Sequence, residues 1–166
     1  MKKINLICSV FVALLFLSSC SSSKEARTYA REINGKWQLQ TVVTEGIAIA
    51  SQTKALLLNE ADLKCFVGTV WTFNNKTHLG TYTITQNSGE CASVKRYVRW
   101  SVYEAEGQPK LLQFKKVDDK YYKDIDEGNS GYRFTILQID NTTMKLKSDV
   151  TFEGKEVSFI YNFIRN

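Results

Sequence analysis

Residues 35–43, GKWQLQTVV, decide the fold of this chain of 166 residues. Gly35 can take backbone angles that residues with a Cβ atom avoid, so it suits the turn before a strand. From Trp37 onward the side chains alternate, with Trp37 and Leu39 on one face and glutamines on the other. A glycine turn followed by a strand with one large aromatic residue is typical of the start of a closed antiparallel β-structure.

The same period of two recurs along the chain, between turn residues such as Asp140-Asn141 and Glu153-Gly154. Residues 51–63 form the one predicted helix, because Ser51 offers a cap and several leucines a loose apolar face. Short strands joined by short turns imply antiparallel neighbours, and closing the sheet removes its edges. The sequence therefore predicts an all-β fold, an eight-stranded antiparallel up-and-down β-barrel with one short helix between strands 1 and 2. The predicted strands are residues 36–44, 66–73, 79–86, 94–104, 110–117, 132–139, 144–151 and 155–164.

The N-terminal segment is typical of a secretion signal. Lys2 and Lys3 precede an apolar run, residues 4–17, that is too short to span a bilayer comfortably. The next residues, Leu17-Ser18-Ser19-Cys20, resemble a bacterial lipobox, whose cysteine becomes the acylated first residue. Two or more acyl chains such as palmitate hold a protein stably on a membrane. We therefore expect residues 1–19 to be a lipoprotein signal peptide and Cys20 to carry lipid at the cell envelope. The lack of an aspartate after Cys20 favours the outer membrane.

The residues that follow the predicted signal peptide have a length that suits one domain. Residues 20–31 are polar and are expected to form a lipidated, flexible tether, followed by a barrel domain over residues 32–166. Of the 22 basic residues, Lys2 and Lys3 leave with the signal, so that 20 remain against 17 acidic residues. These charges are interspersed, so the sequence gives no sign of a nucleic-acid-binding surface.

Two cysteines remain in the barrel domain, Cys65 and Cys91. In the oxidising compartment that a secretion signal implies, we expect them to form a disulfide. A two-thiolate metal site is the alternative, and it lacks partners because His78 is the only histidine. We expect no metal and no cofactor.

The sequence resembles the lipocalin-like family, and more narrowly the lipocalin-family lipoproteins of Bacteroidetes. The resemblance rests on Gly35-Lys36-Trp37, residues 65–73, residues 80–84, Cys91 and the closing strand, residues 157–163. It implies an eight-stranded calyx with a hydrophobic or amphipathic ligand in its mouth. In classical lipocalins an arginine near the end of the last strand packs across this tryptophan. Arg165 matches that position, so Trp37 and Arg165 are expected to close one end of the barrel. The motif that classical lipocalins carry between strands six and seven is not found.

Aromatic residues at strand positions are the candidates for a binding site. An eight-stranded barrel is just wide enough either to hold one small ligand or to be filled by its own side chains, so both alternatives stay open. The candidate interior residues are Trp71, Phe73, Tyr82, Trp100, Phe114, Phe134, Phe159 and Tyr161.

Catalysis finds little support in the sequence. A histidine-based triad has only His78, beside a hairpin turn, and no nucleophile-elbow, phosphate-binding or zinc-protease motif is present. The acidic loop, residues 118–131, lacks the ligand spacing of a calcium loop, so we interpret it as a solvated loop. Its Tyr121 and Tyr122 make it a candidate flap over the barrel mouth. We therefore expect no enzyme activity.

Two functions follow from these patterns. The first is an envelope-anchored protein that binds a small hydrophobic or amphipathic ligand in the barrel. The alternative is a non-enzymatic structural or interaction protein, whose plugged barrel docks onto another envelope protein through its outer surface or through residues 118–131.

Overall fold

The computed structural model describes residues 23–45, 56–85, 89–120, 123–126, 128, 131–152 and 155–166. The predicted signal peptide, residues 1–19, and Cys20 lie outside the described residues. The same holds for residues 51–55 of the predicted helix and for Tyr121 and Tyr122.

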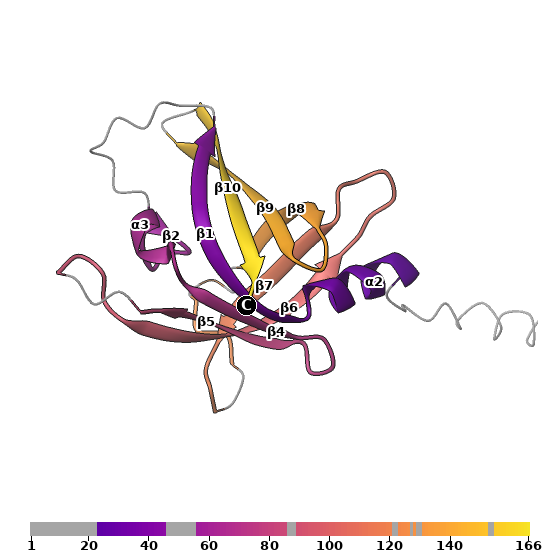
Figure 1. Cartoon of the computed structure of the whole chain (residues 1–166), viewed down its shortest axis with the longest axis horizontal. Coiled ribbons are helices and arrows are strands. Elements are labelled where there is room, and N and C mark those ends of the chain that lie inside the picture. Colours follow the sequence, from indigo (N-terminus) through magenta and orange to yellow (C-terminus); the bar gives the residue numbers. More distant parts are fainter. Residues whose placement is uncertain are drawn as a thin grey trace, which may run out of the picture.

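Eight of the described strands close into one barrel, shown in Figure 1, with the order β1-β10-β9-β8-β7-β6-β5-β4. Every neighbouring pair is antiparallel, and β1 is the seam, because it pairs with β10 on one side and with β4 on the other. The predicted eight-stranded antiparallel barrel is confirmed. Its strands are β1 (Gly35–Glu45), β4 (Val70–Asn74), β5 (Leu79–Ile84), β6 (Val94–Tyr103), β7 (Leu111–Val117), β8 (Tyr132–Ile139), β9 (Thr143–Phe152) and β10 (Lys155–Arg165).

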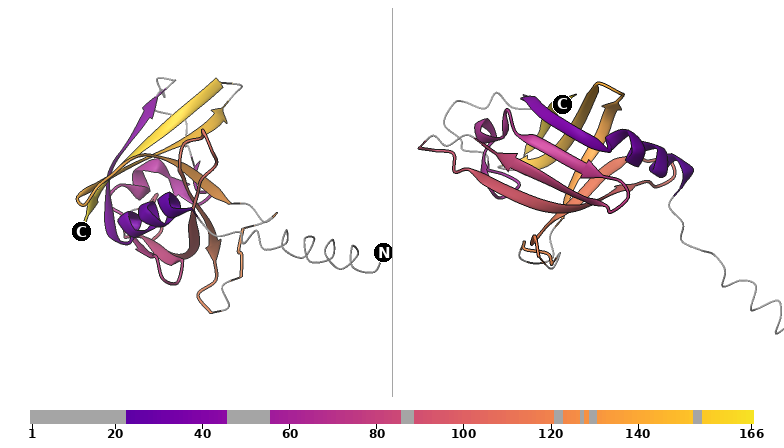
Figure 2. Two further views of the ribbon diagram at one scale, coloured as in Figure 1. Left: turned by 90° about the vertical axis from the view of Figure 1, so that its right-hand side faces the viewer. Right: turned by 60° about the horizontal axis from the view of Figure 1, so that its bottom comes forward.

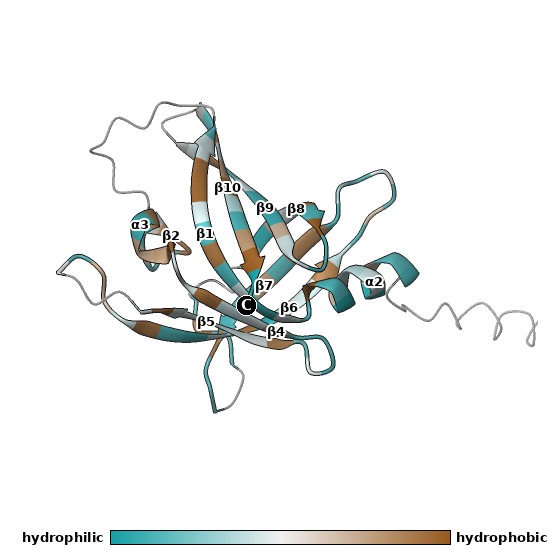
Figure 3. Ribbon diagram, viewed as in Figure 1, coloured by the Kyte–Doolittle hydropathy of each residue, from teal (hydrophilic) through white to brown (hydrophobic). Residues whose placement is uncertain are grey.

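Alternation along the strands places the core inside the barrel. On β5, Gly80, Tyr82 and Ile84 are buried and the residues between them are half-buried. Figure 3 shows the same alternation of hydrophobic and hydrophilic positions along β1 and β10. Strand propensity and period-two patterning therefore decide both the elements and the side that each residue faces.

The connection between β1 and β4 differs in part from the prediction. Residues 56–62, expected to be helical, form a small antiparallel ribbon of β2 (Leu56–Leu57) and β3 (Ala61–Asp62). Leu58 and Asn59 turn this ribbon in the left-handed region, with φ of 55° and 52°, which a continuous helix does not allow. The short helix follows as α3 (Leu63–Phe66), capped by Asp62, whose Oδ1 accepts from the Lys64 N–H at 3.1 Å. Phe66, predicted to begin a strand, belongs to α3.

The predicted tether is also corrected, because Lys24–Ile33 form helix α2. Ser23 caps it, with Oγ accepting from the Ala26 N–H at 2.9 Å. Ala26 and Ile33 are buried, so one face of α2 packs on the barrel. In the left view of Figure 2, α2 lies across one end of the ring of strands. No helix in the described part of the chain combines the length and the apolar run needed to cross a membrane.

Trp37 and Arg165 close this end of the barrel. The Trp37 side chain is fully buried, and its Nε1 donates to the Ile33 carbonyl at 2.8 Å, which ties α2 to β1. The Arg165 guanidinium lies 4.1 Å from the centroid of the Trp37 ring. It also donates to the carbonyl oxygens of Asn141, Asn34 and Glu32 at 2.7, 2.9 and 2.7 Å. One side chain thus joins the last strand, the β8–β9 turn and the end of α2.

Gly35→Ala is expected to lower the free energy of unfolding by about 2–3 kcal/mol. Gly35 has φ of 129°, and a Cβ there would lie 2.6 Å from Nη1 of Arg165, so that the bond from Nη1 to Asn34 is disturbed. Urea unfolding monitored by circular dichroism measures the loss. Gly107→Ala is the comparison variant, because Gly107 has φ of 69° with open space around it and shows the milder strain of the left-handed region alone, about 1 kcal/mol. Equal losses in the two variants would contradict the role given to Arg165.

Candidate functional site

The second end of the barrel, here called the mouth, lies where β1 ends and β10 begins. Residues 56–66, comprising β2, β3 and α3, cover it and are here called the cap. Figure 1 places the cap and α2 at opposite ends of the barrel. Leu57 and Leu58 of the cap are buried and belong to the same hydrophobic core as the barrel strands.

The barrel interior is nearly filled. A cavity of about 10 Å³ remains, comparable with the space for one water molecule. Cap and barrel share its walls, so the two cap leucines supply part of what fills the calyx. The cavity is lined by Leu57, Leu58, Trp71, Leu112, Phe114, Phe134, Leu146, Tyr161 and Phe163.

All eight candidate interior residues are buried, but they do not form one site. Trp71, Phe114, Phe134 and Tyr161 meet around the small cavity in a chain of ring contacts 5.1–5.8 Å between centroids. Phe73 and Trp100 pack on each other, 5.3 Å between centroids, outside both the cavity and the mouth pocket. Phe159 lines the mouth, and Tyr82 stacks on Trp71 at 4.8 Å.

A larger pocket of about 290 Å³ lies at the mouth, between the cap and strands β8, β9 and β10. Its walls are mainly apolar or aromatic and include Leu57, Leu58 and Leu63 from the cap. At one wall, the hydroxyl groups of Ser148 and Tyr161 hydrogen-bond each other at 2.9 Å. Burial raises the pKa of the Tyr161 hydroxyl, so this group stays neutral and available for hydrogen bonding. Tyr161, Phe134 and the two cap leucines also line the interior cavity, so the pocket continues toward the barrel core.

A charged cluster lies beneath the cap on the β5–β7 side of the mouth. Lys116 is only 5% exposed, and its Nζ contacts Asp126 Oδ1 at 2.9 Å and Glu60 Oε2 at 3.4 Å. Arg96 donates to both oxygens of Glu60, from Nε at 2.9 Å and from Nη2 at 2.5 Å. The Tyr82 hydroxyl donates to the same carboxylate at 3.2 Å.

The cluster also holds the cap backbone. Lys116 Nζ and the Tyr132 hydroxyl both donate to the Leu58 carbonyl oxygen, at 3.0 and 2.9 Å. Burial alone raises the pKa of the Glu60 carboxyl, but the hydrogen bonds and charge of Arg96, with Lys116, outweigh it and leave that pKa below its usual value. Burial lowers the pKa of Lys116, but contacts led by Asp126 outweigh it and raise that pKa. Both groups are therefore held in their charged forms.

The sequence did not predict a role for Glu60, Arg96, Lys116 or Asp126. A signal for two of them was present, because Arg96 shares its strand face with buried Val98 and Trp100, and Lys116 shares its face with Leu112 and Phe114. Basic residues at inward-facing positions indicate a buried polar site. The prediction that residues 118–131 form a solvated loop is wrong for Asp126, because its side chain is only 13% exposed.

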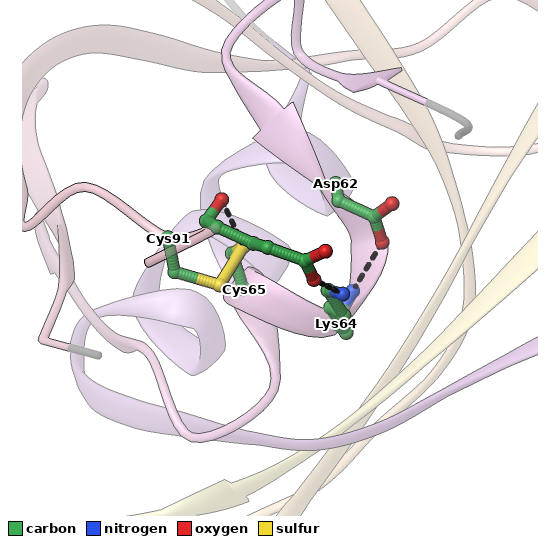
Figure 4. Close-up of a disulfide and its surroundings, with 5 residues drawn as sticks. Asp62, Lys64, Cys65 and Cys91 are labelled. Atoms are coloured by element: carbon green, nitrogen blue, oxygen red, sulfur yellow. Dashed lines mark hydrogen bonds and ion pairs between the residues drawn. A yellow bond between two sulfur atoms is a disulfide. The ribbon is translucent and has the colours of Figure 1, made fainter. Parts of the chain in front are cut away.

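The predicted disulfide between Cys65 and Cys91 is confirmed, with Cα atoms 5.5 Å apart. It joins α3 of the cap to the segment before β6. Figure 4 shows it beside Lys64, whose backbone N–H donates to Asp62 Oδ1 and whose side chain forms an ion pair with Glu90. Among the described residues, no three His, Cys, Asp or Glu side chains gather as a metal site would require.

Replacing both cysteines, Cys65→Ala with Cys91→Ala, is expected to lower the free energy of unfolding by about 3–4 kcal/mol. The bond closes a loop with a sequence separation of 26, and the chain-entropy model gives this magnitude for such a loop. Denaturant unfolding without reductant measures the effect, and adding a reductant to the unmutated protein should reproduce it. A loss below about 1 kcal/mol would contradict a structural role for the bond.

Matches among solved structures include the following three. A lipocalin-like protein from Bacteroides uniformis has 14% identity and a TM-score of 0.39, over 77% of this chain and 96% of that one. A bovine odorant-binding protein, solved with a selenium-containing odorant, has 10% identity and a TM-score of 0.41, over 88% and 78%. Lobster apocrustacyanin A1 has 15% identity and a TM-score of 0.43, over 89% and 72%.

Among curated proteins none matches the sequence. The family model of the lipocalin-like domain matches residues 33–146, from the end of α2 into β9. This match covers more than half of the chain and includes the seam strand, the cap and both disulfide cysteines. The chain belongs to the lipocalin-like domain family.

Proposed function

We propose that this protein is a lipid-anchored member of the lipocalin-like family that binds one small hydrophobic or amphipathic molecule at the mouth of its barrel. Its role is binding rather than catalysis. The mouth pocket carries this proposal, because it is a concave, mostly apolar space with a few polar groups at its wall. Its volume of about 290 Å³ lies at the lower end of the usual range for ligand pockets.

The filled interior is compatible with this function, because part of the filling comes from the cap. Leu57 and Leu58 belong to the cap, not to the barrel strands, and the pocket and the interior cavity share these two residues. A ligand that takes their place extends from the mouth into the aromatic calyx. Ligand binding therefore competes with the packing of the cap.

The anchor is supported by the N-terminal sequence, in which Cys20 ends a lipobox-like segment. Cys20 lies three residues before Ser23, the N-cap residue of helix α2. Because α2 packs at the closed end of the barrel, an anchor at Cys20 holds that end toward the membrane and leaves the mouth facing away. Cys20→Ala should move the protein from the membrane fraction to the soluble fraction. Retention of that variant in membranes would overturn the anchoring.

A fluorescence titration with a dansyl-labelled undecanoic acid tests the binding site. We expect saturable binding that Ser148→Tyr weakens by roughly tenfold or more, because a larger side chain fills the pocket wall. Thr151→Tyr is the matched control: Thr151 is exposed on the same strand as Ser148 and lies outside the pocket lining, so this variant should bind like the unmutated protein. Absence of saturable binding, or equal affinities in the two variants, would overturn the site.

The small interior cavity favours a second candidate, a plugged barrel that serves as an interaction module for another envelope protein. The same titration separates the two functions. Failure of the probe to bind, together with cross-linking of the intact protein to one defined envelope protein, would favour the interaction module.

A further inference from the structure

The Glu60 carboxylate occupies a site that three barrel strands build. Arg96 on β6 holds both of its oxygens, Lys116 on β7 lies 3.4 Å from Oε2, and Tyr82 on β5 donates to the same oxygen at 3.2 Å. The Glu60 side chain is 12% exposed and that of Lys116 is 6% exposed. Two cations and a neutral hydroxyl aimed at one carboxylate, with an arginine fork on both oxygens, are the elements of a carboxylate-binding site.

The cap as a whole has the chemical layout of an amphipathic acid. Leu57 and Leu58 fill the apolar calyx beside Trp71 and Tyr161, and Glu60, two residues further along, places its carboxylate on the cationic site. The apolar part and the charged part thus lie in the order in which an acyl chain and its head group would lie. The cap fills the calyx as an internal stand-in for such a molecule.

The formal charges of the cluster favour a head group with one negative charge. Arg96 and Lys116 contribute two positive charges, and Asp126, paired with Lys116 at 2.9 Å, contributes one negative charge. With the negative charge of Glu60, the four side chains have a formal net charge of zero. A single carboxylate that replaces Glu60 keeps this balance, whereas a doubly charged phosphate adds an uncompensated charge in a partly buried site.

Two features favour replacement of the Glu60 carboxylate by the carboxylate of a ligand. Leu58 and Asn59 hold left-handed backbone angles, which cost free energy for residues with a side chain, so the closed cap is under local strain. A groove of about 400 Å³ outside the cap is lined by both Glu60 and Arg96, so solvent and solutes reach the ion pair from that side.

From these contacts we propose that Arg96, Lys116 and Tyr82 form a binding site for the carboxylate of a single-chain amphipathic acid, and that Glu60 occupies it as an internal competitor. The acyl chain takes the place of Leu57 and Leu58 in the calyx. This inference rests on the proposed ligand-binding function and adds the chemistry of the head group and the residues that select it.

Two probes test the head-group site, the dansyl-labelled undecanoic acid and its methyl ester, which differ only at the head group: the ester has no charge and carries one extra methyl group. The protein carries Cys20→Ala, so that no acyl chain of its own competes. We expect the acid to bind roughly tenfold or more tightly than the ester, as a charge-assisted hydrogen-bonded head group implies. Glu60→Gln should tighten binding of the acid further, because the internal competitor loses its charge.

Arg96→Met should abolish the preference for the acid over the ester while leaving ester binding in place. Arg99→Met, on the exposed face of the same strand, and Glu106→Gln, in the exposed turn between β6 and β7, are matched controls that should retain the unmutated preference. Thermal unfolding of each variant shows that it is folded at the assay temperature. Should Arg96→Met fail to fold, Tyr82→Phe, which removes one donor to the site, should reduce the preference in the same direction.

The outcomes distinguish this inference from the proposed function. Equal affinity for acid and ester, in the unmutated protein and in Glu60→Gln, would overturn the carboxylate site and leave ligand binding intact. Weaker binding of the acid to Glu60→Gln would show that Glu60 supports the ligand site, and would overturn its role as a competitor. Failure of both probes to bind any of these proteins would overturn the proposed function and this inference together.

Discussion

Trp37→Ala is expected to lower the free energy of unfolding by about 3–5 kcal/mol, the range for truncating a buried aromatic residue. The side chain is fully buried at the closed end, so its removal leaves a cavity between α2 and the seam of the barrel. The substitution also deprives the Ile33 carbonyl of its hydrogen-bond donor and the Arg165 guanidinium of the ring 4.1 Å from it. Denaturant unfolding monitored by circular dichroism measures the loss.

Trp37→Phe separates the loss of the hydrogen bond to Ile33 from the loss of the aromatic ring, because it keeps a ring and removes only the indole N–H and some volume. We expect a loss of about 1–3 kcal/mol, the cost of leaving the buried Ile33 carbonyl unpaired. Affinity for the dansyl probe should stay unchanged in both variants below their unfolding temperatures, since Trp37 lies at the end opposite the mouth. A loss below about 1 kcal/mol in Trp37→Ala, or a loss of probe affinity in the folded variant, would contradict this division of the barrel.

The strands were predictable because each carries its own period-two pattern and is bounded by turn residues. Residues 132–139 were predicted as a strand, and β8 has these bounds. The disulfide followed from two cysteines in an expected oxidising compartment. These features depend on local sequence or on composition, and the sequence contains both directly.

The cap and its charged cluster were not predictable in the same way. Leu57 and Ala61 are four residues apart and suit one face of a helix, but two left-handed residues and a docking site in the barrel mouth impose a ribbon on residues 56–62. Glu60, Arg96 and Asp126 are widely separated in sequence, so only the closed barrel shows that they meet. Helix α2 was not predicted, because its sequence is mostly polar and therefore resembles a tether in composition. Only Ala26 and Ile33 of this helix are buried.

Lys116→Met is the second large effect, with an expected loss of about 3–5 kcal/mol in the free energy of unfolding, the cost of removing one partner from a buried ion pair. Methionine retains the apolar length of the side chain but leaves Asp126, whose Oδ2 already lacks a hydrogen-bond partner among the described residues, without its cation. It also removes the donor at 3.0 Å from the Leu58 carbonyl, which loosens the cap. Glu60 keeps Arg96, so the charge left unpaired is that of Asp126.

Lys115→Met is the matched control for this prediction, because it changes the neighbouring residue, whose ion pair with Asp124 is more exposed and should contribute about 1 kcal/mol or less. Adding Asp126→Asn to Lys116→Met should recover part of the loss, since the unpaired charge is then removed. Equal losses in Lys115→Met and Lys116→Met, or no recovery in the double variant, would show that Lys116 acts only through packing. With recovery, the cluster is electrostatic, and the same Lys116 that stabilises the closed cap is the cation that a bound carboxylate would share.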